Sequence, residues 1–278
     1  MTGEKHSRRR FLQGGLALTA AGLAGCSSSG STGTATPDSI FRDTSVSGSS
    51  LRITLREDHE ISTVNLIAPD GSEFRSTNVE TGVTTVKFDL FDFYPGQHYT
   101  PGEHELVAVS DGEELSSTSF NLQPDLRLAS VEQYSGGTNS PQNRANLLAT
   151  VENVGTAPTW VYYLGYSGTP NATHTPQEGH PKDSPLKALE MPNSKQETIL
   201  APSETQSFLG RWPPFQFSGE EHCREMKIEF DLTVYSGIGE NLTRQLRATL
   251  SGEKIQELYR ETCSEISIEM IDERGTDG

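Results

Sequence analysis

Residues that could bind a metal are concentrated in one stretch, from His174 to His180, with Asp183 close by. Zinc sites use histidine, cysteine and carboxylate ligands at short spacings, so these three side chains are the strongest metal candidates in the chain. Pro176 interrupts the stretch, however, and the spacing fits neither a helix nor a hairpin. We therefore predict a solvated polar loop, with no bound metal and no cofactor.

Other arrangements that would support chemistry are missing from the sequence. A blue-copper site needs two histidines beside its cysteine and methionine, but no histidine lies between Cys263 and Met270. The pair Asp89 and Asp92 lacks the spacing of a calcium loop. The chain has neither a Gly-x-Ser-x-Gly elbow nor a glycine-rich phosphate loop. We predict that the protein is not an enzyme. An exported hydrolase or metalloenzyme with its site in residues 167–197 is the alternative.

The first 25 residues are organised as an export signal. Basic residues, including Arg8 to Arg10, precede a weakly apolar run from Gly14 to Leu23, and small residues precede Cys26. The run is too short and too rich in glycine and alanine to predict a permanent membrane span. We expect residues 1–25 to be removed as a signal peptide.

Two motifs in this segment specify the export route and an anchor. Ser7-Arg8-Arg9-Arg10-Phe11-Leu12 resembles the twin-arginine motif, which directs folded proteins across the membrane, and Leu23-Ala24-Gly25-Cys26 resembles the lipobox of lipoproteins. The resemblance implies that Cys26 carries a lipid and holds the protein on the extracellular face of the cell membrane. An ordinary cleaved signal with an incidental cysteine is the alternative.

The remaining two cysteines predict a disulfide. Once Cys26 is assigned to lipidation, Cys223 and Cys263 are the only cysteines left, and exported domains tend to pair their thiols. Closing a loop of about 40 residues stabilises a domain by about 4 kcal/mol in the chain-entropy model. Two free buried thiols, or a metal site shared with His222, are the alternatives.

Charge and composition narrow the classes of partner. The formal net charge is −16, and acidic residues are spread along the chain, which argues against binding to nucleic acid. Only the lipid on Cys26 should favour the membrane, since anionic headgroups repel an acidic surface. The dispersed acidity and the twin-arginine lipobox together resemble surface lipoproteins of halophilic archaea. High salt would screen the self-repulsion of such a chain.

Hydrophobic alternation predicts an all-β fold. Leu51, Ile53 and Leu55 recur with a period of two, as do the apolar residues from Met226 to Val234, which lead through a turn into a second strand at 242–250. A final strand is predicted around Ile266 to Met270. Ile255, Leu258 and Tyr259 have helical spacing, which favours a single helical turn.

We divide the chain into four parts. The signal peptide is followed by a lipidated cysteine and a linker rich in Ser, Gly and Thr at 26–38, an Ig-like β-sandwich at 39–123, and a second sandwich at 124–278. Glu152-Asn153-Val154-Gly155 and Leu200-Ala201-Pro202-Ser203-Glu204 resemble turns of the CARDB group of extracellular Ig-like adhesion modules. The insertion at 167–197 departs from that pattern.

Two loops could face a ligand, and two motifs could carry a glycan. Exposed aromatic residues beside polar groups form binding surfaces, although aromatic residues in loops more often cover a core. The candidates for ligand contact are Phe93, Tyr94, Tyr99, Trp212 and Phe215. Asn171 and Asn241 each begin an N-glycosylation sequon.

These features together predict a lipid-anchored surface protein that acts as a binding, adhesion or structural module for an unknown protein or glycan partner. A solute-binding lipoprotein of a transporter is a further alternative, but such receptors need alternating helices and strands that the sequence lacks.

Overall fold

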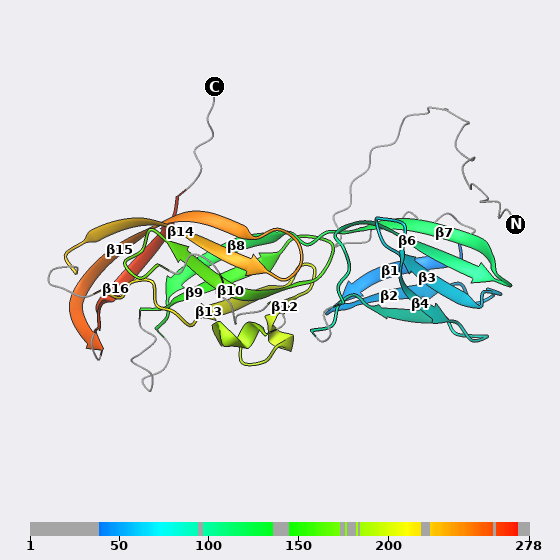
Figure 1. Ribbon diagram of the computed structural model, residues 1–278, viewed down its shortest axis with the longest axis horizontal. Coiled ribbons are helices and arrows are strands. Elements are labelled where there is room, and N and C mark those ends of the chain that lie inside the picture. The colour runs from blue at the N-terminus through cyan, green and yellow to red at the C-terminus, as the bar shows by residue number, and fades with distance from the viewer. Residues whose placement is uncertain are drawn as a thin grey trace, which may run out of the picture.

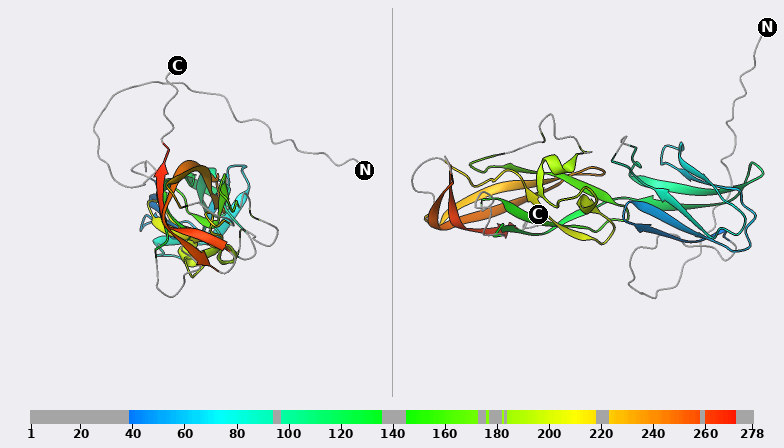
Figure 2. Two further views of the ribbon diagram at one scale, coloured as in Figure 1. Left: turned by 90° about the vertical axis from the view of Figure 1, so that its left-hand side faces the viewer. Right: turned by 90° about the horizontal axis from the view of Figure 1, so that it is seen from below.

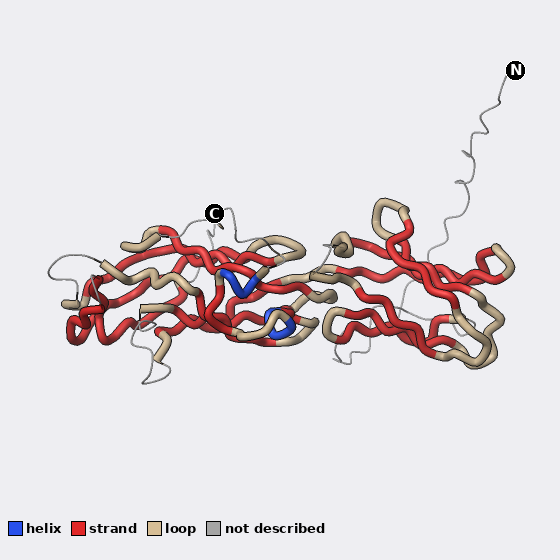
Figure 3. The backbone as a smooth tube through the Cα atoms, turned by 60° about the horizontal axis from the view of Figure 1, so that its bottom comes forward, coloured by secondary structure: helices blue, strands red, loops and turns tan. Residues whose placement is uncertain are grey.

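The computed structural model describes residues 39–93, 97–135, 145–172, 176, 182, 184–217, 223–257 and 260–271. Over these residues the chain is mainly strand and forms two β-sandwiches that lie end to end (Figure 1, Figure 2). Helix among them is limited to two single turns, η2 (Pro185–Lys187) and η3 (Gln196–Thr198), both on the second sandwich (Figure 3). The predicted all-β class with two Ig-like sandwiches is confirmed.

The first sandwich has sheets of order β1-β2-β5 and β4-β3-β6-β7. Alternation produces these strands: Leu51, Ile53 and Leu55 on β2 point into the core while Arg52 between them is exposed. The strands are β1 (Phe41–Ser47), β2 (Ser50–Leu55), β3 (Thr63–Ile67), β4 (Glu73–Asn78), β5 (Thr85–Asp89), β6 (Gly102–Ser110) and β7 (Glu113–Leu122).

The second sandwich has sheets of order β11-β13-β9-β8 and β12-β10-β14-β15-β16. The predicted hairpin is present, with β14 paired to β15 from Met226 opposite Leu250 to Val234 opposite Leu242. The strands are β8 (Leu126–Gln133), β9 (Leu147–Asn153), β10 (Thr159–Ser167), β11 (Leu189–Met191), β12 (Ile199–Leu200), β13 (Thr205–Gly210), β14 (Met226–Ser236), β15 (Leu242–Glu257) and β16 (Arg260–Met270).

The C-terminal strands correct one expectation. Ile255 lies in β15 and pairs with Thr262 of β16, so the helical turn predicted there is wrong. Leu258 and Tyr259 lie outside the described residues. The chain forms a strand here despite the helical spacing, because β16 supplies hydrogen-bond partners for the backbone of β15 along most of its length. The final strand predicted at Ile266 to Met270 is the second half of β16.

The first sandwich receives the chain at the end that faces away from the second. β1 starts at Phe41, opposite Leu55, and runs to Ser47. β7 ends at Leu122, directly before the segment that leads to the second sandwich. The start of β1 therefore lies at the far end of the elongated molecule, and residues 123–125 join the two sandwiches at its middle (Figure 1).

Candidate functional site

The joint between the two sandwiches is the most elaborate polar and aromatic site in the described structure. Its linker, Gln123-Pro124-Asp125, is held by the turn that follows β9. The backbone N–H of Thr156 donates to Gln123 O at 2.8 Å, and that of Val154 donates to Asp125 O at 2.8 Å. The Thr156 hydroxyl donates to Asn121 O at 2.7 Å and accepts from the backbone N–H of Gln123 at 3.0 Å. The linker is therefore bonded along its length.

Asn153 and Gly155 explain why this turn has an Asn-x-Gly sequence. The Asn153 side chain is buried, and its Nδ2 donates to Ala157 O at 2.8 Å and to Leu200 O at 2.9 Å. Its Oδ1 accepts from the backbone N–H of Gly155 at 3.1 Å. A Cβ on Gly155 would lie 2.2 Å from Gln123 O, so only glycine lets the linker pass this closely. The motif thus holds the joint.

Trp160 on β10 is the centre of the apolar contact between the sandwiches. Its ring centroid lies 4.8 Å from that of Phe91, 5.3 Å from that of Phe93 and 5.0 Å from that of His98, all on the segment that follows β5. The indole Nε1 donates to Lys182 O at 2.7 Å, which satisfies its polar atom. The side chain is 0% exposed. Burial of a whole indole at the contact favours one arrangement of the two sandwiches.

Tyr99 adds a hydrogen bond across the same contact. Its hydroxyl donates to Pro158 O at 2.8 Å, and burial raises its pKa far above the ordinary range. Beside it, His104 is 1% exposed, with its ring 6.2 Å from that of Tyr99 and 6.1 Å from that of Phe120. Desolvation lowers the pKa of His104, against the opposing effect of its Nδ1–H bond to Gly102 O. The core of the first sandwich therefore extends, through Tyr99, to the backbone of the second.

Aromatic rings also cover the outer face of the second sandwich next to the joint. Tyr163 packs against Trp212 with centroids 5.8 Å apart and against Tyr235 at 5.6 Å. Tyr162 lies 6.2 Å from Tyr235, and desolvation, with a smaller contribution from that neighbour, raises its pKa. β10 is consequently buried on both faces, whereas a strand of a sandwich ordinarily has one face toward the core and the other toward solvent.

A cleft of about 460 Å³ lies between the sandwiches. None of the described residues that line it is charged, although the chain carries a net charge of −16. Val154, which is 46% exposed, lies on one wall, and Val46 on the other wall comes from β1. The cleft is thus a neutral, half-apolar surface that both sandwiches contribute.

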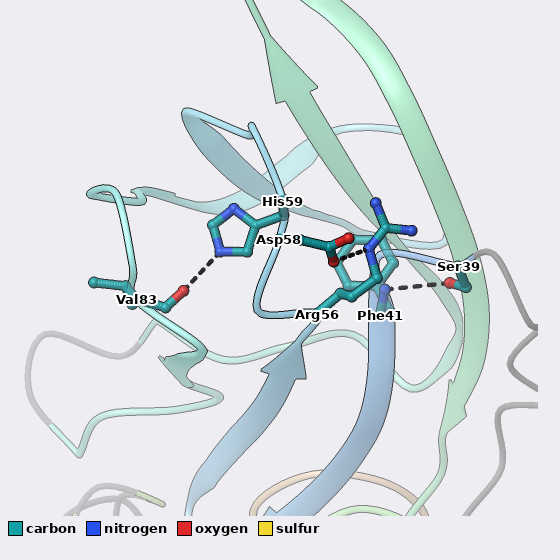
Figure 4. Close-up of polar contacts among 6 residues, drawn as sticks. All are labelled: Ser39, Phe41, Arg56, Asp58, His59 and Val83. Atoms are coloured by element: carbon teal, nitrogen blue, oxygen red, sulfur yellow. Dashed lines mark hydrogen bonds and ion pairs between the residues drawn. The ribbon is translucent and has the colours of Figure 1, made fainter.

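The far end of the first sandwich, where the chain arrives, has no comparable aromatic contact among its described residues. The hydroxyl of Ser39 accepts from the backbone N–H of Phe41 at 3.2 Å, and Arg56 pairs with Asp58 at 2.5 Å (Figure 4). His59 Nε2 donates to Val83 O at 2.7 Å (Figure 4). These bonds close the end of the sandwich around the incoming chain.

Two of the five aromatic residues predicted to face a ligand prove to be core residues. Tyr99 is 2% exposed and Phe215 is 0% exposed, with the latter ring 5.2 Å from that of Phe230. The prediction that these two face a ligand is wrong, because both side chains are buried within hydrophobic core clusters. Phe93 and Trp212 are half-buried, and Lys195 Nζ lies 5.6 Å from the Phe93 ring centroid. Tyr94 lies outside the described residues.

The predicted disulfide joins Cys223 to Cys263, with Cα atoms 5.4 Å apart. Cys263 is buried on β16, so the bridge fixes this strand to the segment that precedes β14. Gln133 Oε1 of β8 accepts from the backbone N–H of Ile266 at 2.9 Å. β16 is therefore attached to both sheets of the second sandwich.

The remaining candidates divide between described and undescribed parts of the chain. Cys26, His174, His180 and Asp183 lie outside the described residues, so the structure does not place the lipid site or the metal candidates. Among the described residues no group of three or more His, Cys, Asp or Glu side chains could hold a metal ion. Asn171 is half-buried, whereas Asn241 is exposed at the β14–β15 turn. No helix in the described ranges has the length and apolarity to cross a bilayer.

The sequence did not identify Trp160, His104 or Asn153 as site residues. The run Thr159-Trp160-Val161-Tyr162-Tyr163 offered a signal, since three aromatic residues among five break the usual alternation of a half-exposed strand. Such a run predicts a strand covered on both faces.

Comparison with known proteins identifies no family. No protein-family model matches the chain, and no curated protein is similar to it at a significant level. Among solved structures it is similar to a beta-glucuronidase from glycoside hydrolase family 2, with 12% identity and a TM-score of 0.24 over 78% of this chain and 20% of that chain. A glycosyl hydrolase family 2 member from Bacteroides cellulosilyticus DSM 14838 matches with 12% identity and a TM-score of 0.20, over 71% of this chain and 24% of that chain. The chain spans about a quarter or less of the length of either structure.

Proposed function

We propose that the protein is a lipid-anchored surface protein whose two sandwiches form a stiff unit, acting as a non-enzymatic binding, adhesion or structural module for a protein or glycan. In this proposal the twin-arginine signal exports the folded chain, Cys26 carries the lipid, and the neighbouring linker connects it to the first sandwich. The likeness to lipoproteins of halophilic archaea and to CARDB modules belongs to the same proposal.

The observation that carries the proposal is the joint. Two sandwiches on a free linker would move independently, which is the ordinary expectation for small interfaces within a chain. Here Trp160 is fully buried between the sandwiches, Tyr99 donates to Pro158 O, and the linker backbone is bonded to Val154 and Thr156. A joint of this kind suits a protein that must hold one end at a set distance from its attachment.

The direction of the chain supports the same proposal. β1 starts at the end of the first sandwich opposite the joint, so an anchor preceding it would place the second sandwich outermost (Figure 1). The second sandwich also carries the disulfide and the insertion at 167–197. We infer that the second sandwich is the part presented to a partner. The neutral cleft at the joint would then be open to the same partner.

Fractionation of producing cells tests the anchor. The wild-type protein should stay with the membrane and be removed from intact cells by an external protease, while Cys26→Ser should appear in the medium or remain unprocessed. A Cys223→Ser, Cys263→Ser double variant, with Cys26 intact, controls for general effects of losing cysteine. Full membrane retention of Cys26→Ser would contradict the proposed attachment.

Small-angle X-ray scattering of the mature protein tests the stiff unit. The expected scattering is that of one elongated shape over a range of salt concentrations, and Trp160→Ala should broaden the distance distribution. If the wild type already required an ensemble of bent shapes, the sandwiches would be independent and the proposed function would lose its main support.

A further inference from the structure

The two glycosylation sequons of the chain differ in the state of their asparagine side chains. N-glycosylation requires the asparagine Nδ2 to reach a glycan donor, and such sites lie on surface loops of exported proteins. Asn171 is half-buried, its Nδ2 donates to Pro213 O at 2.8 Å, and its backbone N–H donates to Pro214 O at 3.1 Å. The folded chain therefore occupies the nitrogen that would have to react.

Asn241 is in the opposite situation. It is exposed in the turn between β14 and β15, and its Oδ1 accepts from the backbone N–H of Ser236 at 3.1 Å. This bond orients the side chain, and no hydrogen bond within the described part of the chain occupies Nδ2. Thr243, the third residue of the sequon, is exposed, and its hydroxyl is 3.0 Å from that of Thr233. Both sequon side chains are accessible without unfolding.

We propose that Asn241 is N-glycosylated on the folded protein and that Asn171 is not. The inference rests on the proposed export route, since a protein that crosses the membrane folded can be modified only where the folded surface permits. The co-reactant is a lipid-phosphate-linked glycan. Nδ2 of Asn241 forms a bond to C1 of the first sugar and loses one proton, while the bond from C1 to the phosphate oxygen breaks and the lipid phosphate leaves.

The surroundings of Asn241 give the glycan a place on the molecule. A groove of about 320 Å³ runs from this turn to the interdomain linker and is lined by Asn241, Arg244 and residues 123–126. Gly239 in the same turn has φ +86°, and a Cβ there would lie 2.7 Å from Pro124 Cγ, so the turn and the linker are in close contact. A glycan on Asn241 would therefore cover the outer side of the linker.

Intact-mass measurement and glycopeptide mapping of protein purified from its producing cells test the inference. Wild type and Asn171→Gln should carry the same glycan mass, and Asn241→Gln should lose it completely. Thr243→Ala should also lose the glycan, whereas the matched Thr243→Ser, which keeps a sequon hydroxyl, should retain it. All of these changes are at exposed or half-buried positions, and thermal unfolding of each variant verifies folding.

The outcomes separate this inference from the proposed anchor. Mature protein with a lipidated Cys26 but unmodified Asn241 would overturn the inference and leave the anchor standing. A glycan on Asn171 would also overturn it, because that residue can react only before folding. Glycosylated Asn241 on a chain whose Cys26 is not lipidated would support the inference and contradict the anchor.

Discussion

The two sandwiches share one strand order but differ at their edges. β1-β2-β5 corresponds to β8-β9-β13, and β3-β6-β7 corresponds to β10-β14-β15. The second sandwich adds β11 beside β13 and β16 beside β15, whereas the described residues place no further strand beside β5 or β7. An unpaired edge can pair with another chain, and adding these strands moves the edges of the second sandwich outward to β11 and β16.

The cores of the two sandwiches also differ. The second has its own buried cluster around residues such as Phe208, Phe230 and Leu246. The core of the first is continuous with Trp160, Tyr162 and Tyr163 of the second. The first sandwich therefore uses the surface of the second to complete the end of its core, whereas the second has a further core cluster that includes no residue of the first.

The largest expected effect comes from Trp160→Ala. Removing a fully buried tryptophan typically destabilises a protein by about 4 kcal/mol, and here the cavity would open at the joint. We expect the unfolding transition of the first sandwich to move to lower temperature and to separate from that of the second. Differential scanning calorimetry of the mature protein measures both transitions.

Phe208→Ala is the matched control for Trp160→Ala, because Phe208 is equally buried but belongs to the separate core of the second sandwich. It should lower the second transition and affect the first only where the first depends on a folded partner. If Trp160→Ala changed the second sandwich alone, the proposed dependence of the first on the joint would be refuted.

Removing the Cys223–Cys263 bridge should have the next largest effect. The chain-entropy model gives about 4 kcal/mol for a loop of this length, and we expect a loss of about 3 kcal/mol because residual structure in the reduced, unfolded chain lowers that value. The first sandwich contains no cysteine, so Cys223→Ser with Cys263→Ser should lower the unfolding temperature of the second sandwich directly. Hydrogen exchange should show β16 losing protection first. Equal loss of protection across both sandwiches would show that they do not differ in this way.

Asn153→Ala tests the hydrogen bonds that hold the turn beside the linker. Ala157 O and Leu200 O would lose their donor in a buried site, which costs about 2 kcal/mol. Asn146→Ala is the control: Asn146 is also buried in the second sandwich, but its Nδ2 donates to Gly210 O, away from the linker. Both variants should lower the midpoint of urea unfolding, and only Asn153→Ala should broaden the distance distribution in scattering. A broader distance distribution for both variants would show that Asn153 has no specific role in fixing the joint.

The sequence predicted strands correctly where one face of the sheet is buried and the other is exposed to solvent. The alternation from Met226 to Val234 predicted β14 and its hairpin with β15, because the period of two reflects a core on one side only. It missed β10, whose residues are buried on both faces and so show no alternation. The covering of its outer face by loops and by the other sandwich is a tertiary effect: the aromatic run at 159–163 indicates a covered strand but not what covers it.

The candidate site shows the same division. Once Cys26 was assigned to lipidation, counting cysteines was enough to predict the disulfide, since the two remaining thiols allow one pairing. Tyr99 and Phe215 were misjudged because a loop sequence does not reveal whether an aromatic ring turns outward or caps a core. The role of Gly155 depends on the linker backbone lying 2.2 Å from where its Cβ would be, a distance set only when the sandwiches dock.

The smallest predicted effect concerns His104 and the pH dependence of the first sandwich. Burial lowers the pKa of His104 from its ordinary 6.5, and its Nε2 is buried without a hydrogen-bond partner among the described residues. Protonation would therefore place an unpaired N–H and a charge in the core. Because the folded state resists the proton, the unfolded state binds more protons as pH falls below 6.5.

The contribution of His104 to stability is thus fully present above pH 6.5 and declines as pH falls from there toward the lowered pKa of the folded state. At constant salt, the urea midpoint of the first sandwich should fall between pH 7 and pH 5.5 more steeply in the wild type than in His104→Gln, which cannot take up the proton. Tyr99 and Phe120 are its ring neighbours, and neither titrates in this interval. The second sandwich of the same molecules serves as the internal reference. Parallel slopes for the two proteins would show that His104 does not distinguish the sandwiches, and a steeper slope for His104→Gln would reverse the predicted sign.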